Sequence, residues 1–189
     1  MKSLDMSKIV YPVGRITQNG VSLLGTCCLL SKTGHFVTAS HVTNNDDRNL
    51  VIIINKIRTF NDYQDTTDMS VKYVGVKIHA TDPFSDLCIL KAEFTTDIHM
   101  EMNIGTADEC KPGDTVAILG YPHADQGRMV LTQQITQIGA KVLIGSEGIK
   151  TKHMILNVQS RPGQSGGPIF NLDNMSLVGI LIPELFIIK

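Results

Sequence analysis

Short apolar segments alternate with turn-forming residues along almost the whole chain. Residues 51–54 and 116–119 are examples, and Gly, Pro, Asn or Asp residues lie between such segments. Segments of this kind predict short β-strands, and their close spacing predicts an all-β sandwich or barrel. No run approaches the ~18 apolar residues of a spanning helix, so no membrane contact is predicted. The first eight residues also lack the apolar core of a signal peptide.

A glycine-rich turn, RPGQSGGP at residues 161–168, interrupts this pattern. Its glycines permit backbone angles that other residues resist, so the turn can expose the hydroxyl of Ser165 beside free backbone amides. That arrangement suits a nucleophile. Gly and Ser are also ordinary turn formers, so a plain β-turn remains the alternative on this motif alone.

Two further polar residues lie where apolar strands are predicted to end or begin. His41 ends the run that starts at Phe36, and Asp86 immediately precedes the apolar segment 87–90. A carboxylate in that setting needs a hydrogen-bonding or charged partner. Asp82 is the rival acid, but a proline follows it directly, which favours a turn role. The other histidines lack a comparable setting and are predicted to be surface or loop residues: His35, His79, His99, His123 and His153.

These residues occur in the order histidine, aspartate, serine, which is the order of chymotrypsin-type proteases. With them the chain resembles the trypsin-like peptidase domain of the chymotrypsin superfamily, and among its branches the disulfide-free, bacterial HtrA-like members. Two other segments carry the resemblance. Residues 25–38, GTCCLLSKTGHFVT, are similar to the hairpin that leads into the histidine, and residues 103–122 are similar to the segment that crosses between the barrels.

The resemblance implies an all-β fold of two six-stranded Greek-key β-barrels in one peptidase domain, residues 1–189. The first barrel, residues 1–105, would carry His41 and Asp86, and the second, residues 106–189, would carry Ser165. Family members usually continue past the strand predicted at 177–184 with another hairpin, whereas an apolar run follows here, so an incomplete second barrel is expected. Three explanations stay open: the run docks as a last strand, the chain is one portion of a longer protein, or a partner completes the barrel.

The resemblance implies a serine endopeptidase that needs no metal or cofactor and acts on polypeptides through an acyl-enzyme. Ser165 would attack the scissile carbonyl, His41 would carry the proton, and Asp86 would orient the histidine. The backbone N–H groups of Gly163 and Ser165 would form the oxyanion hole. A catalytically silent protease-like module that binds peptides or partners is the main alternative, and an esterase is a weaker one.

Activation and restraint are expected to differ from those of secreted zymogens. Gln164 stands where zymogens carry an aspartate that pairs with a newly freed ammonium, and an amide cannot neutralise such a buried charge. Cleavage before Ile9 is therefore not expected, and Ile9 and Val10 are predicted to begin a strand. A regulatory protein or an additional domain at the C-terminal edge is an expected partner, and the protease could be latent until it binds.

Substrate-binding residues follow from the resemblance alone. Gln159 and Ser160 would line the pocket for the side chain before the scissile bond. Ile182, Pro183 and Glu184 would lie beside an extended substrate that adds to the strand edge through main-chain hydrogen bonds. For Glu184 two interpretations stay open: attraction of a basic substrate residue, or a solvated carboxylate at the end of a strand.

Charge and cysteine content bear on the predicted partners and on the predicted cellular compartment. A net charge of −1 without a basic stripe gives no support for nucleic-acid binding. Four cysteines match no common zinc spacing, and two of them are adjacent in the chain, so free and mostly buried thiols are expected. Free thiols predict a reducing compartment, and hence a cytoplasmic location.

Overall fold

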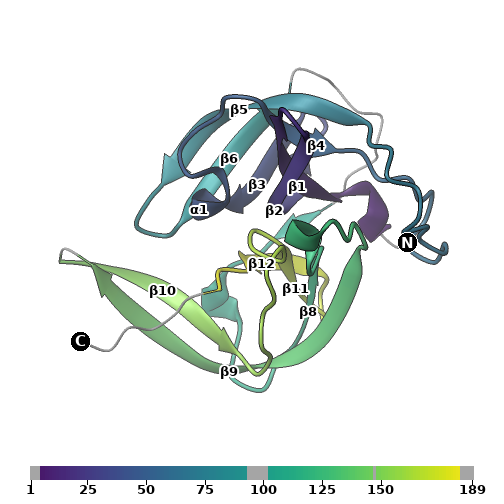
Figure 1. Ribbon diagram of the computed structural model, residues 1–189. Helices are drawn as coiled ribbons and strands as arrows, with labels where there is room; N and C mark the ends of the chain where they lie inside the picture. The colour runs from purple at the N-terminus through teal and green to yellow at the C-terminus, as the bar shows by residue number, and fades with distance from the viewer. Residues whose placement is uncertain (1–4, 93–101, 147, 184–189) are drawn as a thin grey trace.

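The first half of the chain forms a closed β-barrel (Figure 1). The computed structural model describes residues 5–92, 102–146 and 148–183. A short 3-10 helix, Met6–Lys8, precedes the barrel, and the single-turn helix α1, Ser40–Thr43, follows its third strand. The strands, in the spatial order β1-β2-β3-β6-β5-β4, are β1 (Val10–Thr17), β2 (Gly20–Ser31), β3 (His35–Ala39), β4 (Leu50–Ile53), β5 (Tyr73–Asp82) and β6 (Leu87–Ala92).

The second half forms a six-stranded curled sheet in the order β10-β9-β8-β11-β12-β7, with β10 and β7 at its edges. Short 3-10 helices at Ala107–Glu109 and Ala124–Gln126 flank β8. In Figure 1 the long hairpin of β9 and β10 extends away from the rest of this sheet. The strands are β7 (Asn103–Ile104), β8 (Thr115–Gly120), β9 (Thr132–Ser146), β10 (Ile149–Leu156), β11 (Pro168–Asn171) and β12 (Ser176–Ile180).

Alternating burial explains why these segments are strands. In β6 the buried residues are Cys88, Leu90 and Ala92, and their neighbours along the strand are only partly buried. A period of two turns one face of a strand toward the core. The largest apolar cluster fills the first barrel and continues into the second half through Leu119, Tyr121 and other residues, so the two halves share one core. A smaller cluster lies within the second sheet.

The predicted all-β class is confirmed, and the second sheet is open as expected, because its edge strands, β10 and β7, are not paired with each other in the described part of the chain. Three details refine the prediction. The strand that begins near Leu177 ends at Ile180, because the backbone N–H and C=O of Leu181 pair with the glycine-rich turn. β7 lies before residue 105 but pairs with β12. Within the described residues no helix is long and apolar enough to cross a membrane.

Candidate active site

His41 and Asp86 are brought together by the pairing of β3 with β6. Ala39 at the end of β3 is opposite Leu87 at the start of β6, so the residues that follow and precede them are neighbours. The backbone N–H of Ser40 donates to the carbonyl of Asp86 at 2.9 Å. Asp86 has a φ of 51°, a left-handed conformation that aspartate tolerates better than most residues.

The carboxylate of Asp86 holds His41 through both of its oxygens. The imidazole Nδ1 lies 2.5 Å from Oδ2, and the backbone N–H of His41 donates to Oδ1 at 2.9 Å. A proton held on Nδ1 by the carboxylate leaves Nε2 free to accept one from a substrate or nucleophile. The rival Asp82 has the predicted turn role instead: its Oδ1 accepts from the backbone N–H groups of Phe84 and Ser85.

The turn that carries Ser165 packs directly against the end of β3. The carbonyl of Ser165 accepts from the backbone N–H of Thr26 at 2.8 Å. A Cβ placed on Gly166 would lie 2.1 Å from Thr38 Oγ1 and 2.9 Å from the backbone nitrogen of Ala39, two residues before His41. Ser165 is 8% exposed, and its hydroxyl makes no hydrogen bond to any residue that the structure describes.

Backbone amides in this turn fall into two groups. The N–H of Gln164 donates to the carbonyl of Arg161, that of Gly166 to Leu181, and that of Gly167 to Gln164. In contrast, the N–H groups of Gly163 and Ser165 have no partner in the described part of the chain. Two free amides on either side of a bonded one are the donor arrangement that an oxyanion needs.

The orientation of the Gly163 amide is set by its neighbour. The carbonyl of Pro162 accepts from the backbone N–H of His123 at 2.7 Å. Because a trans peptide is planar, the N–H of Gly163 points away from that carbonyl. The φ of Gly163 is 90°, a conformation that favours glycine. The carbonyl of Gly163 in turn accepts from Thr26 Oγ1 at 2.8 Å.

Gln164 fixes the turn without any ammonium group. Its side chain is almost fully buried. Oε1 accepts from the backbone N–H of Arg161 at 2.8 Å, and Nε2 donates to Oε1 of Gln134 at 2.8 Å. Ile9 is fully buried and β1 begins at Val10, which confirms that this segment leads into a strand.

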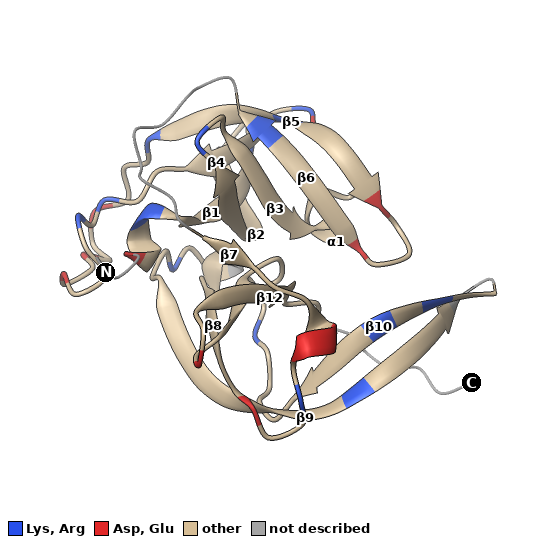
Figure 2. Ribbon diagram, turned by 180° about the vertical axis from the view of Figure 1, so that it is seen from behind, with Lys and Arg blue, Asp and Glu red and all other residues tan. Residues whose placement is uncertain are grey.

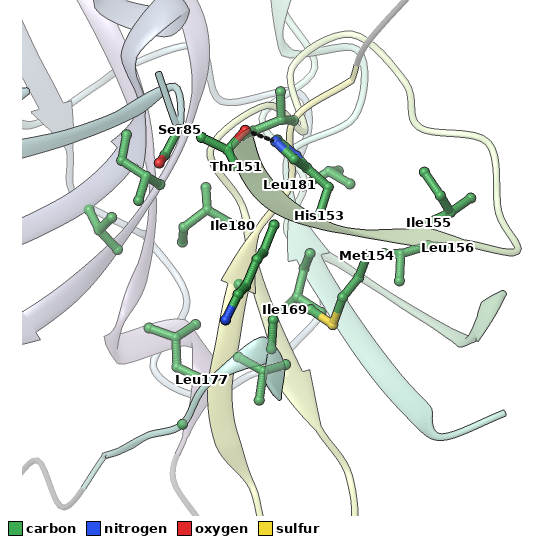
Figure 3. Close-up of a pocket in the computed structure, with 18 of the residues that line it drawn as sticks. Ser85, Thr151, His153, Met154, Ile155, Leu156, Ile169, Leu177, Ile180 and Leu181 are labelled. Atoms are coloured by element: carbon green, nitrogen blue, oxygen red, sulfur yellow. Dashed lines mark hydrogen bonds between the residues drawn. The ribbon is translucent and has the colours of Figure 1, made fainter. Parts of the chain in front are cut away.

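A cavity of about 800 Å³ lies between β10, β12 and the first barrel (Figure 3). Ser160, Ile182 and Pro183 line it, together with apolar side chains of both strands. Gln159 is exposed and is not among its lining residues, and Glu184 lies outside the described residues. The hydrogen bond drawn as a dashed line in Figure 3 joins Thr151 Oγ1 and His153 Nε2, which are 2.8 Å apart.

A second hollow, of about 330 Å³, is lined by His41, Asp86 and His153 as well as by Ile182 and Pro183. His153 is half-buried in β10, so the prediction of a surface or loop position is wrong for this residue. The alternation of β10 could have flagged an inward-facing histidine. The curl of the second sheet decides which face of the hairpin approaches His41. The local sequence pattern does not contain that information.

The remaining histidines vary in setting. His79 is exposed in β5, and His123 lies in a loop, both consistent with the prediction. The prediction is also wrong for His35, which is half-buried at the start of β3, where Nδ1 lies 3.0 Å from the hydroxyls of both Ser31 and Thr33. His99 lies outside the described residues.

Other titratable groups offer little competing chemistry. Burial raises the pKa of the Cys27 and Cys28 thiols, which keeps them protonated and unreactive. Hydrogen bonds from Ser85 lower the pKa of Asp82. Within the described residues, no group of three or more His, Cys, Asp and Glu side chains could hold a metal ion. Figure 2 shows basic and acidic residues spread over both halves. Lys152 of β10 and Asp108 form an ion pair of 2.6 Å.

Known proteases are similar to this chain over most of its length. Residues 25–180 match the family model described as a trypsin-like peptidase domain. A probable periplasmic serine endoprotease, DegP-like, from Pseudomonas fulva is 29% identical over 89% of this chain and 31% of that protein. A protein of the same name from Marinomonas sp. is 31% identical over 84% of this chain and 29% of that protein. The chain therefore spans less than a third of the length of these relatives.

Solved structures with the same fold include the apo form of the MamO protease domain from Magnetospirillum magneticum. It is 18% identical, with a TM-score of 0.68 over 93% of this chain and 84% of that chain. An inactive form of Rv3671c from M. tuberculosis is 17% identical, with a TM-score of 0.69 over 96% of this chain and 77% of that chain. At these identities the likeness establishes the fold, and it confirms the predicted chymotrypsin-like class.

The prediction of a cytoplasmic location is wrong, because several relatives are named periplasmic serine endoproteases. That prediction rested on unpaired cysteines. In the structure all four are free and buried: Cys27, Cys28, Cys88 and Cys110. Buried thiols are shielded from oxidants and exchange partners, so their reduced state does not report the compartment.

Proposed function

Since this chain belongs to the trypsin-like peptidase family, we propose that it is a serine endopeptidase that works through His41, Asp86 and Ser165. The observation that carries the proposal is the contact of 2.5 Å between His41 Nδ1 and Asp86 Oδ2, beside the turn of Ser165. The free amides of Gly163 and Ser165 support it. The names of the relatives support a periplasmic location.

In the proposed reaction, Ser165 Oγ attacks the scissile carbonyl carbon while His41 Nε2 takes its proton. The carbonyl oxygen becomes an oxyanion, which accepts hydrogen bonds from the N–H groups of Gly163 and Ser165. Collapse of this intermediate breaks the C–N bond, and His41 returns the proton to the leaving amine. Water then attacks the acyl-enzyme with the same proton transfers, which releases the acid product and regenerates Ser165.

The substrate is proposed to lie in an extended conformation beside residues 181–183. Ile182 makes no main-chain hydrogen bond to any described residue, so its backbone groups are available to a peptide. Ser160, Ile182 and Pro183 line the adjoining cavity. The roles of Gln159 and Glu184 rest on the family resemblance.

A regulatory protein or an additional domain is proposed to act at the C-terminal edge of the second sheet, which is open because its edge strands β10 and β7 are not paired with each other in the described part of the chain. If the partner supplies the missing wall of the substrate pocket, the domain would be latent until that partner binds. The cavity between the strands supports this proposal, because its lining includes apolar side chains of both strands.

The test is covalent labelling by a fluorophosphonate probe, together with hydrolysis of casein. We expect the wild-type protein to be labelled at Ser165, and we expect labelling and hydrolysis to be lost in Ser165→Ala and His41→Ala. Ser22→Ala, at an exposed serine of β2, is the matched control and should behave as wild type. Labelling that persists in Ser165→Ala would overturn the assignment. A wild-type protein that binds unfolded casein but is never labelled would favour the silent module.

A further inference from the structure

The loop between β8 and β9, residues 121–131, is tied to the first barrel at its C-terminal end by one side chain. Gln64 Nε2 donates to the carbonyl of Leu131 at 2.7 Å, and Gln64 Oε1 accepts from the backbone N–H of Leu131 at 2.7 Å. Gln64 belongs to the long connection between β4 and β5, far from Leu131 in the sequence. A side-chain amide that makes both bonds imitates one rung of a β-ladder and fixes the backbone at that point.

The N-terminal end of the same loop is also anchored in the first barrel. The hydroxyl of Tyr121 donates to Asn55 Oδ1 and to the carbonyl of Val10. The backbone N–H of Tyr121 donates to Thr26 Oγ1 at 3.2 Å. Tyr121 is almost completely buried, so this end sits in the shared core.

Between its two ends the loop is a compact body centred on His123. The carbonyl of His123 accepts from the backbone N–H groups of Gln126 and Arg128 at 3.0 and 3.3 Å. The N–H of His123 donates to the carbonyl of Pro162 at 2.7 Å, the bond that fixes the plane of the Pro162–Gly163 peptide and with it the direction of the Gly163 N–H. The φ of His123 is 60°, a left-handed backbone conformation that is uncommon outside glycine.

The loop and the glycine-rich turn are in close van der Waals contact. A Cβ on Gly163 would lie 2.3 Å from the carbonyl oxygen of Tyr121 and 2.9 Å from the backbone nitrogen of Ala124. Separations this short mean that a displacement of the loop has to move the turn as well. The direction of the Gly163 amide therefore depends on where the loop is held.

We propose that Gln64 is a positioning residue for the oxyanion hole. By fixing Leu131, it holds the loop in the place from which His123 orients the Pro162–Gly163 peptide. The inference rests on the proposed serine endopeptidase function, because it concerns the same oxyanion. It also explains how a turn that lacks the ammonium–aspartate pair is held from the first barrel.

The experiment compares peptide hydrolysis by the wild-type protein, Gln64→Ala, Gln64→Glu and Asn61→Ala. Gln64→Glu keeps the size and the accepting oxygen but cannot donate to the Leu131 carbonyl while it is ionised. Asn61 lies in the same connection, is exposed, and makes no side-chain hydrogen bond to a described residue, so Asn61→Ala is the matched control. Active sites are titrated with the fluorophosphonate probe, so that kcat refers to competent enzyme.

We expect kcat to fall by about 5- to 20-fold in both Gln64 variants, less than the roughly 10²- to 10³-fold loss of a whole oxyanion donor. KM should stay within about twofold, because the oxyanion exists only after attack. A peptide boronate, which mimics the tetrahedral state, should bind more weakly by the same factor as kcat falls.

Each outcome separates this inference from the proposed function. A wild-type protein that is never labelled fails the proposed function and with it the inference. A labelled wild type with unchanged kcat and boronate affinity in both Gln64 variants overturns the inference alone. Loss in Gln64→Ala but not in Gln64→Glu would also overturn it, because packing rather than the paired hydrogen bonds would then hold the loop.

Discussion

His41 and Asp86 are joined by two hydrogen bonds that approach from different directions. One runs between the imidazole Nδ1 and Oδ2 at 2.5 Å, and the other from the backbone N–H of His41 to Oδ1 at 2.9 Å. The first bond sets the tautomer of the ring, and the second fixes the carboxylate plane against the backbone that carries it. The two oxygens therefore have separable roles, one electrostatic and one geometric.

Asp86→Asn tests that separation. An asparagine keeps the shape and can accept the backbone bond, but its amide cannot stabilise an imidazolium, and it favours the wrong ring tautomer. We expect kcat to fall by roughly 10⁴-fold while the fold and the thermal midpoint change little. Asp82→Asn is the control, because an amide oxygen can still accept from Phe84 and Ser85 in the turn, and it should keep near wild-type activity. Equal losses in the two variants would contradict the assignment of Asp86.

Gln164→Ala tests how the glycine-rich turn is held. The substitution leaves the backbone N–H of Arg161 and the side chain of Gln134 without their present partner. A buried polar group that loses its hydrogen bond costs about 1–3 kcal/mol. We expect a decrease of that size in the free energy of unfolding, measured by urea titration, together with a lower kcat. Gln133→Ala, at an exposed neighbour of Gln134 on β9, should leave both quantities unchanged.

Local signals in the sequence predicted the all-β class, which is confirmed, and they nominated His41, Asp86 and Ser165, whose catalytic roles stay a prediction. His41 and Asp86 each adjoin a short apolar strand, and the strand pairing of β3 with β6 then makes them neighbours. Pro83 after Asp82 separated the turn acid from its rival. His153 and Gln64 could not be predicted, because their positions depend on how β10 curls and how a long connection folds across the domain. The prediction of a cytoplasmic location failed for another reason. A free thiol shows that the cysteine is buried, and it does not show whether the compartment is reducing.

Buried thiols and phenols predict lower stability at alkaline pH. Burial raises the pKa of the Cys27 and Cys28 thiols and raises that of Tyr11 to about 12. The folded protein then retains protons that the unfolded chain releases above about pH 8.5 for thiols and about pH 10 for tyrosine. This stability is fully present below those values and is lost as the pH rises.

Urea unfolding at pH 7 to 10.5 measures the effect, with a slope approaching about 1.4 kcal/mol per pH unit for each thiol. Cys28→Ala should reduce the slope above pH 8.5 by about one thiol's share. Val13→Ala leaves a cavity in the same barrel but removes no titrating group, so it should lower the free energy of unfolding equally at every pH. A slope that is the same in Cys28→Ala and the wild type would contradict the assignment.

Gly166→Ala tests whether the serine turn needs its close contact with β3. The φ of Gly166 is 80°, and a Cβ there would lie 2.3 Å from the carbonyl oxygen of Thr26 and 2.1 Å from Thr38 Oγ1. Gly113 has a φ of 97°, but a Cβ there would meet no atom within 4 Å, so it isolates the backbone cost, which is about 1 kcal/mol. We expect Gly113→Ala to lose about that much stability and to keep full activity. Gly166→Ala should lose at least about 3 kcal/mol, and its folded fraction should lose probe labelling at Ser165, since the turn has to move away from the strand that carries His41. Similar losses in the two variants would mean that the packing of the turn against β3 has no role in placing the serine.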